Sequence, residues 1–206
     1  MKILIVADHE ERSLWGDWTE HTRKALSDVE LVLSAGDLSP HYLEFLVTML
    51  NVPLVYVRGN HDGVYDSRPP EGCIDADGRI IETAGLRILG LGGSMRYKPG
   101  DKDMYTEKEM QKRIASLGRR RLADIMSGRD GFDILLTHAP CRGFGDMDDL
   151  PHRGFECFNT LLERYSPRLH CFGHVHQEYG RFTRVRQHTS GTLLINACGH
   201  YIIEYR

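Results

Sequence analysis

The sequence contains few cysteines, no CxxC pair and no long apolar run. Its five cysteines are widely scattered among 206 residues and odd in number, which argues against a disulfide framework and a structural zinc site. The N-terminal apolar run, residues 3–7, is too short for a signal-peptide core, and no later run approaches roughly 18 apolar residues. We therefore expect an unexported cytoplasmic protein without a membrane span.

The sequence also lacks an excess of basic charge. Lysine and arginine total 26 against 29 acidic residues, which gives a formal net charge of −3. This balance offers no electrostatic argument for a polyanionic partner, so we expect no nucleic-acid partner. The apolar content of 41% is sufficient for a substantial core, and the length suits a single domain over residues 1–206. The sequence does not indicate an oligomeric state.

Short β-rich runs alternate with longer amphipathic segments along the chain. Runs of strand length occupy residues 2–7, 30–35, 53–58, 86–92, 132–137, 168–173, 192–197 and 200–205. These runs are mostly apolar throughout, which is typical of strands covered on both faces. The alternation predicts an α/β fold, and the strand-rich C-terminal third suggests a second sheet or mixed pairing.

Helix-start signals precede two of the amphipathic segments. Ser39-Pro40 is typical of an N-cap followed by proline at the first helical position. Thr106 and Glu109 form a capping-box pattern before a long charged helix that runs to about Met126. A third helix is expected over residues 155–165. The sequence therefore predicts helices between several of the strands.

Chemically versatile side chains occur where the predicted strands stop. These strand ends carry carboxylates, an amide and imidazoles: Asp8, Asp37, Asn60, His61, His138, His174 and His176. Ligands of open α/β sheets bind beyond the carboxyl ends of the strands, so these groups can converge there. Each one alone is typical of a turn or a packed histidine. Together, and without a thiolate, they favour hard or borderline divalent metals, and their number implies two ions.

The ordered motifs DxE, GD, GNHD, H and GHVH, from Asp8 to His176, resemble the calcineurin-like metallophosphoesterase superfamily. The superfamily pattern is DxH, GD, GNH(D/E), H and GHxH. The run THAPCRGFGDMDD and the later LHCFGHVHQEYG are similar to small single-domain phosphodiesterase-like members. The resemblance implies a four-layer α/β/β/α sandwich with two packed mixed β-sheets, which agrees with the strand pattern above.

The resemblance also implies roles for the motif residues. Two divalent ions, Mn, Fe or Zn with Mn favoured, would be held by Asp8, Glu10, Asp37, Asn60, His138, His174 and His176. Asp37 would bridge the ions, which activate a bridging water as the hydroxide that attacks phosphorus. His61 would face the substrate as the general acid or as a donor to the phosphoryl oxygens. Asp62 is expected to fix the turn or orient a neighbour.

Position 10 departs from the superfamily pattern, because Glu10 stands where members usually have histidine. Side chains on an extended chain alternate, so Asp8 and Glu10 should face the same way and His9 the opposite way. Glu10 would then bind the first ion directly or through water and favour Mn²⁺ or Fe. The alternative is a kinked strand end, in which His9 turns in or the position is left to solvent.

Substrate contacts are expected from loops that leave the same sheet edge. Arg96, His152 and Arg153 are the candidates for binding phosphate oxygens that the metals do not hold. The predicted function is a metal-dependent phosphoesterase, with a phosphodiesterase acting on a small organic or nucleotide-like phosphodiester as the leading interpretation. The alternatives are a scaffold that has lost catalysis and a nuclease of the same superfamily. The net negative charge counts against the nuclease.

Overall fold

The computed structural model describes residues 1–16, 18–126, 131–180 and 182–205, with the side chains of residues 118–126 outside this description. The described residues form two large sheets. The first has the strand order β13-β1-β2-β3-β4 and is parallel except for β13, which runs antiparallel to β1. Its strands are β1 (Lys2–Ala7), β2 (Val29–Ser34), β3 (Leu54–Tyr56), β4 (Ile74–Asp75) and β13 (Gly199–Glu204).

The second sheet has the order β11-β12-β10-β9-β6-β5, and its two edge strands run antiparallel to their neighbours. Its strands are β5 (Arg79–Thr83), β6 (Leu86–Leu91), β9 (Ile134–Thr137), β10 (Leu169–Phe172), β11 (Val185–Gln187) and β12 (Leu193–Asn196). A short parallel pair, β7 (Ser94–Met95) and β8 (Met104–Tyr105), lies in the connection after β6.

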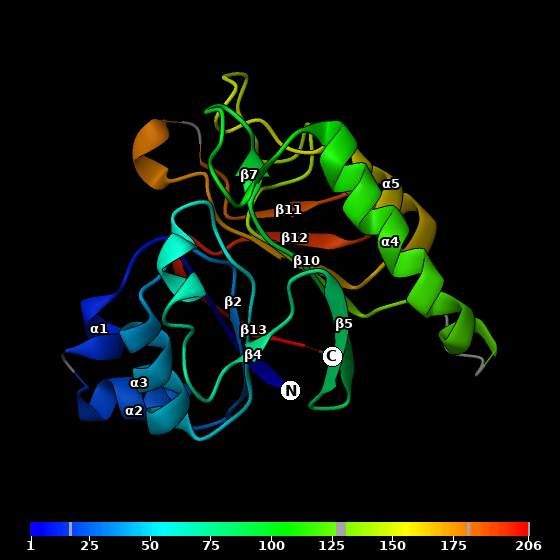
Figure 1. Cartoon of the computed structure of the whole chain (residues 1–206). Helices are drawn as coiled ribbons and strands as arrows, with labels where there is room; N and C mark the ends of the chain where they lie inside the picture. The colour runs from blue at the N-terminus through cyan, green and yellow to red at the C-terminus, as the bar shows by residue number, and fades with distance from the viewer. Residues whose placement is uncertain (17, 127–130, 181, 206) are drawn as a thin grey trace.

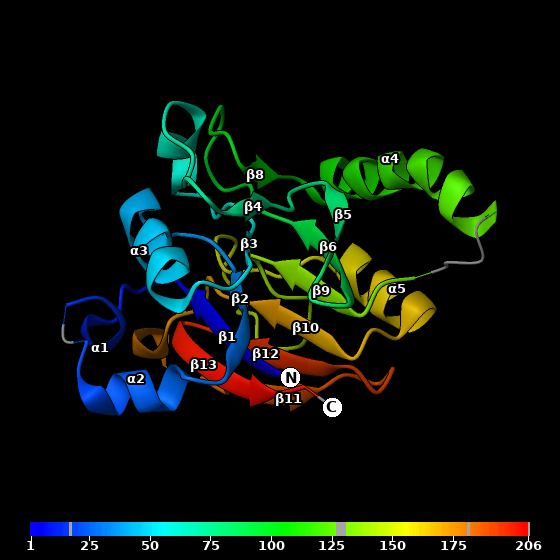
Figure 2. The ribbon, with the colours of Figure 1, turned by 90° about the horizontal axis from the view of Figure 1, so that it is seen from below.

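Helices cover the outer face of each sheet (Figures 1 and 2). On the side of the first sheet lie α1 (Arg12–Trp15), α2 (Glu20–Leu26) and α3 (Pro40–Leu50). On the side of the second sheet lie α4 (Glu107–Met126) and α5 (Glu156–Tyr165). Two 3-10 turns, η1 (Asp62–Asp66) and η2 (Gln177–Tyr179), follow β3 and β10. No helix among the described residues is both long and apolar enough to cross a membrane.

Strand β1 shows how the apolar runs build the core. Ile3 and Ile5 are buried in the cluster between the sheets, which they share with Ile134 of the second sheet. Leu4 and Val6 point to the other face and are buried in the cluster beneath the helices of the first sheet. A continuous apolar run is needed because both faces of the strand are covered.

The predicted four-layer α/β/β/α fold is confirmed, and all eight predicted strands are present. Both helix-start signals are also confirmed. The Ser39 hydroxyl accepts the Tyr42 N–H at 3.3 Å, and the Thr106 and Glu109 side chains form a reciprocal capping box. The elements missed by the sequence analysis are α1, α2, β4, β5, β7, β8 and β11. They are short, and several of the strands among them are half exposed, so their apolar pattern is weak.

Candidate metal centre

Most of the predicted metal ligands meet at the carboxyl ends of the parallel strands. In the first sheet, Asp8, Asp37 and Asn60 follow β1, β2 and β3, and in the second sheet His138 and His174 follow β9 and β10. The ring of His138 reaches across to the first sheet, where its Nδ1 lies 2.8 Å from the Ala35 carbonyl oxygen. Both sheets therefore contribute side chains to one site.

Four of these residues form a buried cluster around His138. The His138 Nε2 atom lies 3.1 Å from the Asn60 Oδ1, 3.1 Å from the His174 Nδ1 and 3.3 Å from the Asp37 Oδ2. His138 is fully buried, and the side chain of Asp37 is only 11% exposed. The cluster therefore lies largely out of contact with bulk water.

Two backbone carbonyls determine which nitrogen of each ring faces the cluster. The His138 Nδ1 donates to the Ala35 carbonyl, and the His174 Nε2 donates to the Pro151 carbonyl, both at 2.8 Å. In the neutral rings, the opposite nitrogens then carry lone pairs. These nitrogens and the oxygens of Asp37 and Asn60 face one another, and such a set of acceptors repels itself unless a proton or a metal cation lies among them. The donor set therefore fits a divalent metal ion.

The charges of the cluster follow from burial and from the pairing of its members. Burial alone would lower the pKa of His138, but the carboxylate of Asp37 beside it raises that pKa to about 9. Burial would raise the pKa of Asp37, yet the His138 ring holds it well below its usual range. Burial and the neighbouring His138 lower the pKa of His174 to about 3. Asp37 is thus ionised and His174 neutral, as metal ligands must be, whereas His138 shares with Asp37 a proton that a bound metal ion would displace.

The backbone is bent sharply at three of the site residues. Asp8, Asp37 and His174 have φ angles of 64°, 56° and 67°, a left-handed region that non-glycine residues rarely adopt. The Ala7 carbonyl accepts the His9 N–H at 2.6 Å, and the Gly173 carbonyl accepts the Val175 N–H at 2.8 Å. Asp8 and His174 are thus the central residues of γ-turns. Backbone strain of this kind is concentrated at functional sites.

The GNHD segment is fixed by Asp62. The buried carboxylate of Asp62 accepts the Asp37 N–H at 2.8 Å and the Gly59 N–H at 2.7 Å, and burial together with the charge of Asp37 raises its pKa to about 6. The expected role of Asp62 in the turn is confirmed. The adjacent His61 donates its backbone N–H to the Asp37 Oδ1 at 2.8 Å, and its side chain is exposed.

A second group of potential ligands lies beside the buried cluster, near Asp8. Both carboxylate oxygens of the buried Asp8 accept the His174 N–H, at 2.9 and 3.1 Å. The His176 Nε2 lies 3.7 Å from the Asp8 Oδ1, and the His9 and His176 ring centroids are 4.8 Å apart. The potential ligand atoms of His9, His176 and Glu178 all lie within 4.8 Å of one another.

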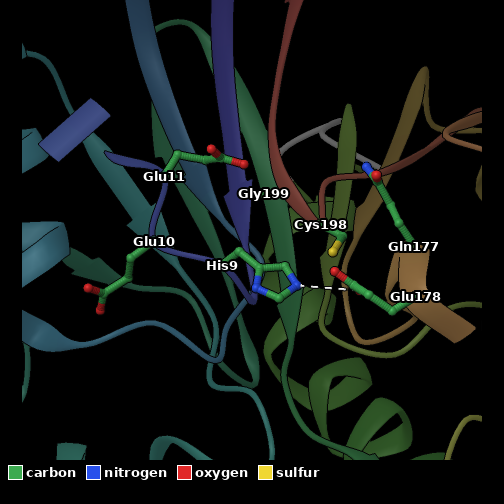
Figure 3. Close-up of a pocket in the computed structure, with 7 residues that line it drawn as sticks. All are labelled: His9, Glu10, Glu11, Gln177, Glu178, Cys198 and Gly199. Atoms are coloured by element: carbon green, nitrogen blue, oxygen red, sulfur yellow. Dashed lines mark ion pairs between the residues drawn. The ribbon is translucent and has the colours of Figure 1, made fainter. Parts of the chain in front are cut away.

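Glu10 is not part of either group. Its Oε1 accepts the backbone N–H of Ser39 at 3.0 Å, at the start of α3. Figure 3 shows the side chain of Glu10 directed away from His9, whose ring points toward Glu178. The expected shared direction of Asp8 and Glu10 is wrong, because β1 ends at Ala7 and the γ-turn at Asp8 interrupts the extended alternation. His9 turns in, as the alternative interpretation has it.

Of the three substrate-contact candidates, His152 lies against the cluster. Its ring centroid is 5.3 Å from that of His174, and its Nδ1 lies 2.6 Å from the Asp149 Oδ2. Arg96 instead donates to Glu109 and to the Met104 carbonyl, each at 3.0 Å, because the β7–β8 pairing directs it to the start of α4.

The third candidate, Arg153, donates to the Asp148 carbonyl of its own loop at 3.2 Å. Its guanidinium group is thus held by the loop that carries it, as that of Arg96 is held by α4. His152 is the candidate that the structure brings together with the predicted ligands.

Tyr179 was missed by the sequence analysis. Its ring stacks on His176 with centroids 4.8 Å apart and an interplanar angle of 11°, and it lies 4.6 Å from the His152 ring. The available signal was the QEY tripeptide directly after GHVH, because a 3-10 turn places the side chain of residue i+3, here Tyr179, over that of residue i, here His176. Glu178, in the same turn, was also missed by the sequence analysis.

A pocket of about 280 Å³ opens beside these residues (Figure 3). It is lined by His9, Glu10, Glu11, Gln177, Glu178, Cys198 and Gly199. Three of these lining residues are glutamates, so the pocket is acidic.

Comparisons with known proteins bear on the family and the fold. A family model described as calcineurin-like phosphoesterase matches residues 1–178. The crystal structure of TT1561 of Thermus thermophilus is similar with a TM-score of 0.61 and 15% identity, over 96% of this chain and 89% of that chain. At this identity the likeness shows the shared fold.

Two curated relatives match over shorter segments. UPF0046 protein T07D4.2 of Caenorhabditis elegans is 41% identical over 70 residues, which are 33% of this chain and 16% of that protein. Metallophosphoesterase domain-containing protein 1 of Homo sapiens is 45% identical over 56 residues, 25% of this chain and 17% of that protein. The matched segments thus span about a sixth of the length of these relatives.

Proposed function

The chain belongs to the calcineurin-like phosphoesterase family, and we propose that it hydrolyses a small organic or nucleotide-like phosphodiester with the help of two divalent metal ions. The observation that carries this proposal is the buried convergence of potential metal ligands on Asp37, Asn60, His138 and His174. The ligand atoms of Asp37, His138 and His174 lie within 4.8 Å of one another and are of the types that divalent metals bind, which supports a working metal centre over an inert scaffold.

The ligands divide into two sets that share Asp37. Asn60, His138 and His174 would hold one ion with Asp37, while Asp8 and His176 would hold the other with the second Asp37 oxygen. When bound, the ions polarise the phosphoryl oxygens and make a water molecule nucleophilic at neutral pH. Two aspartates in the site suit Mn²⁺ or Fe, and the imidazoles also accept Zn²⁺, with Mn²⁺ favoured.

We infer that His61 acts on the substrate. Its backbone N–H is fixed by Asp37 while its imidazole remains exposed, so the ring is free to protonate the leaving oxygen or donate to a phosphoryl oxygen. His152, whose ring lies against that of His174, would bind a phosphate oxygen. The pocket beside His9 would receive one substituent of the diester.

The pocket also bears on the alternative functions. Its volume of about 280 Å³ suits a small group, and its glutamates repel a polyanion. Both features support a small-molecule phosphodiester over a nucleic-acid strand. A scaffold that has lost catalysis would be free to lose its metal ligands, whereas here the Asp37 cluster is assembled.

The test is hydrolysis of an aryl phosphodiester and an aryl phosphomonoester in the presence of Mn²⁺. We expect Asp37→Asn to reduce activity to background, and His61→Ala to lower kcat by about 10²–10⁴-fold with metal content unchanged. His21→Ala, in the exposed face of α2, is the matched histidine control and should retain full activity.

Wild-type activity no higher than that of Asp37→Asn and His61→Ala would overturn the enzyme proposal and favour the scaffold. Cleavage of single-stranded DNA at a higher kcat/KM than that of the small diesters would instead favour the nuclease.

A further inference from the structure

The family pattern supplies a histidine at position 10, and its absence here leaves the ion assigned to Asp8 and His176 without that ligand. We propose that His9 and Glu178 complete this site, so that the ion is held by Asp8, His9, His176 and Glu178 together with the bridging Asp37. This inference rests on the proposed function, because it assigns ligands to one of its two ions. It adds a carboxylate, from the turn after the GHVH motif, to the predicted set.

His9 reaches the site because of the turn at Asp8. The His9 N–H donates to the Ala7 carbonyl at 2.6 Å and closes a γ-turn centred on Asp8. The chain therefore changes direction at Asp8 and does not continue as an extended strand. The residue directly after the aspartate therefore turns toward His176, and the two ring centroids are 4.8 Å apart. The γ-turn thereby brings an imidazole to the site from position 9.

Glu178 reaches the same point from the other side. The 3-10 turn Gln177–Tyr179 starts directly after His176 and folds the Glu178 carboxylate back, with its Oε2 3.8 Å from the His9 Nε2. The stacked ring of Tyr179 fixes the orientation of His176. Two imidazole nitrogens and a carboxylate oxygen within 4.8 Å of one another form a set that divalent transition metals bind.

The other two carboxylates of the pocket do not face the His9 and His176 rings. Glu10 is directed away and accepts the Ser39 N–H, and Glu11 lies against Gly199. A His9–Glu178 ion pair on its own would add little to stability, because both side chains are about half exposed or more. Glu10 and Glu11 therefore serve as controls of equal charge in the same pocket.

The experiment is a titration of the metal-free full chain with Mn²⁺, followed by electron paramagnetic resonance of the free ion and by elemental analysis. The wild type should bind two ions. His9→Ala and Glu178→Gln should weaken one of them at least about tenfold and leave the other unchanged. Glu10→Gln and Glu11→Gln should titrate like the wild type, and thermal unfolding of the metal-free forms checks that every variant is folded.

The outcomes separate this inference from the proposed function. Two bound ions in the wild type with no weakening in Glu178→Gln would overturn the assignment of Glu178 while leaving the phosphoesterase proposal intact. One bound ion, abolished by His138→Ala and unaffected by His9→Ala, would also overturn it. A wild type that binds no ion would overturn the proposed function as well.

Discussion

Gly59 lies so close to the carboxylate of Asp37 that no larger residue fits. A β-carbon on Gly59 would lie 2.0 Å from the Asp37 Oδ1 and 2.5 Å from its Cγ. Gly59→Ala must therefore displace Asp37, on which both metal ions depend. We expect Mn²⁺ affinity to fall at least about tenfold, as it does when ligand-orienting contacts are lost, measured by the same titration.

The matched control lies four residues along the chain. A β-carbon on Gly63 would meet no atom within 4 Å, so Gly63→Ala should leave Mn²⁺ binding unchanged. Equal affinities in Gly59→Ala and the wild type would show that Asp37 is not a ligand in this position. Equal losses of Mn²⁺ affinity in Gly59→Ala and Gly63→Ala would show that the loop tolerates no substitution. The contact between Gly59 and Asp37 would then not be the cause of the loss.

Individual site residues differ in how well the sequence predicts them. Asp37, Asn60 and His138 could be predicted because each follows a buried strand, and the sheets bring such positions to one edge. The directions of His9 and Glu10 could not be predicted from alternation, because they depend on a left-handed Asp8. Aspartate adopts that conformation more often than most residues but still uncommonly, so its presence alone does not mark the turn.

At the scale of elements, helix α5 is capped by a residue of α4. Its own N-cap, Phe155, makes no side-chain cap, and the Glu107 carboxylate instead accepts the N–H groups of Glu156 at 3.1 Å and Cys157 at 2.8 Å. Glu107→Ala should therefore reduce the free energy of unfolding by about 1–2 kcal/mol. Urea denaturation measures this change.

The neighbouring Lys108 provides the comparison, because it is exposed and occupies the same first turn of α4. Lys108→Ala should change the free energy of unfolding by less than about 0.5 kcal/mol. If Glu107→Ala is as mild as Lys108→Ala, the start of α5 does not depend on this cap.

The two caps of these helices illustrate what local patterns can predict. The capping box of Thr106 and Glu109 is visible in the sequence because its partners are three residues apart. Glu107 and Cys157 are 50 residues apart, so their contact follows only from the packing of α4 against α5. The existence of α5 was predicted, whereas the residue that stabilises its first turn was not.

At the scale of the whole molecule, the chain passes from the second sheet to the first after Asn196, and β13 pairs antiparallel with β1. The eight apolar runs indicate strands covered on both faces, and the superfamily resemblance implies that they divide into two sheets. The half-exposed β5 and β11, which close the edges of the second sheet, lack that apolar pattern. Edge strands without an apolar run are thus the part of the architecture that sequence patterns predict least well.

The site joins the two sheets, and this arrangement makes metal binding a determinant of global stability. Asp8, Asp37 and Asn60 follow strands of the first sheet, and His138 and His174 follow strands of the second. An ion that binds only the folded chain at about 100 times its Kd adds about 2.7 kcal/mol, or roughly 5–10 °C in Tm for a chain of this size. We therefore expect EDTA to lower the Tm of the Mn²⁺-loaded protein by this amount in a thermal unfolding scan. Asp37→Asn should lose most of the response, and a wild-type Tm that is identical in EDTA and Mn²⁺ would contradict an ion held between the sheets.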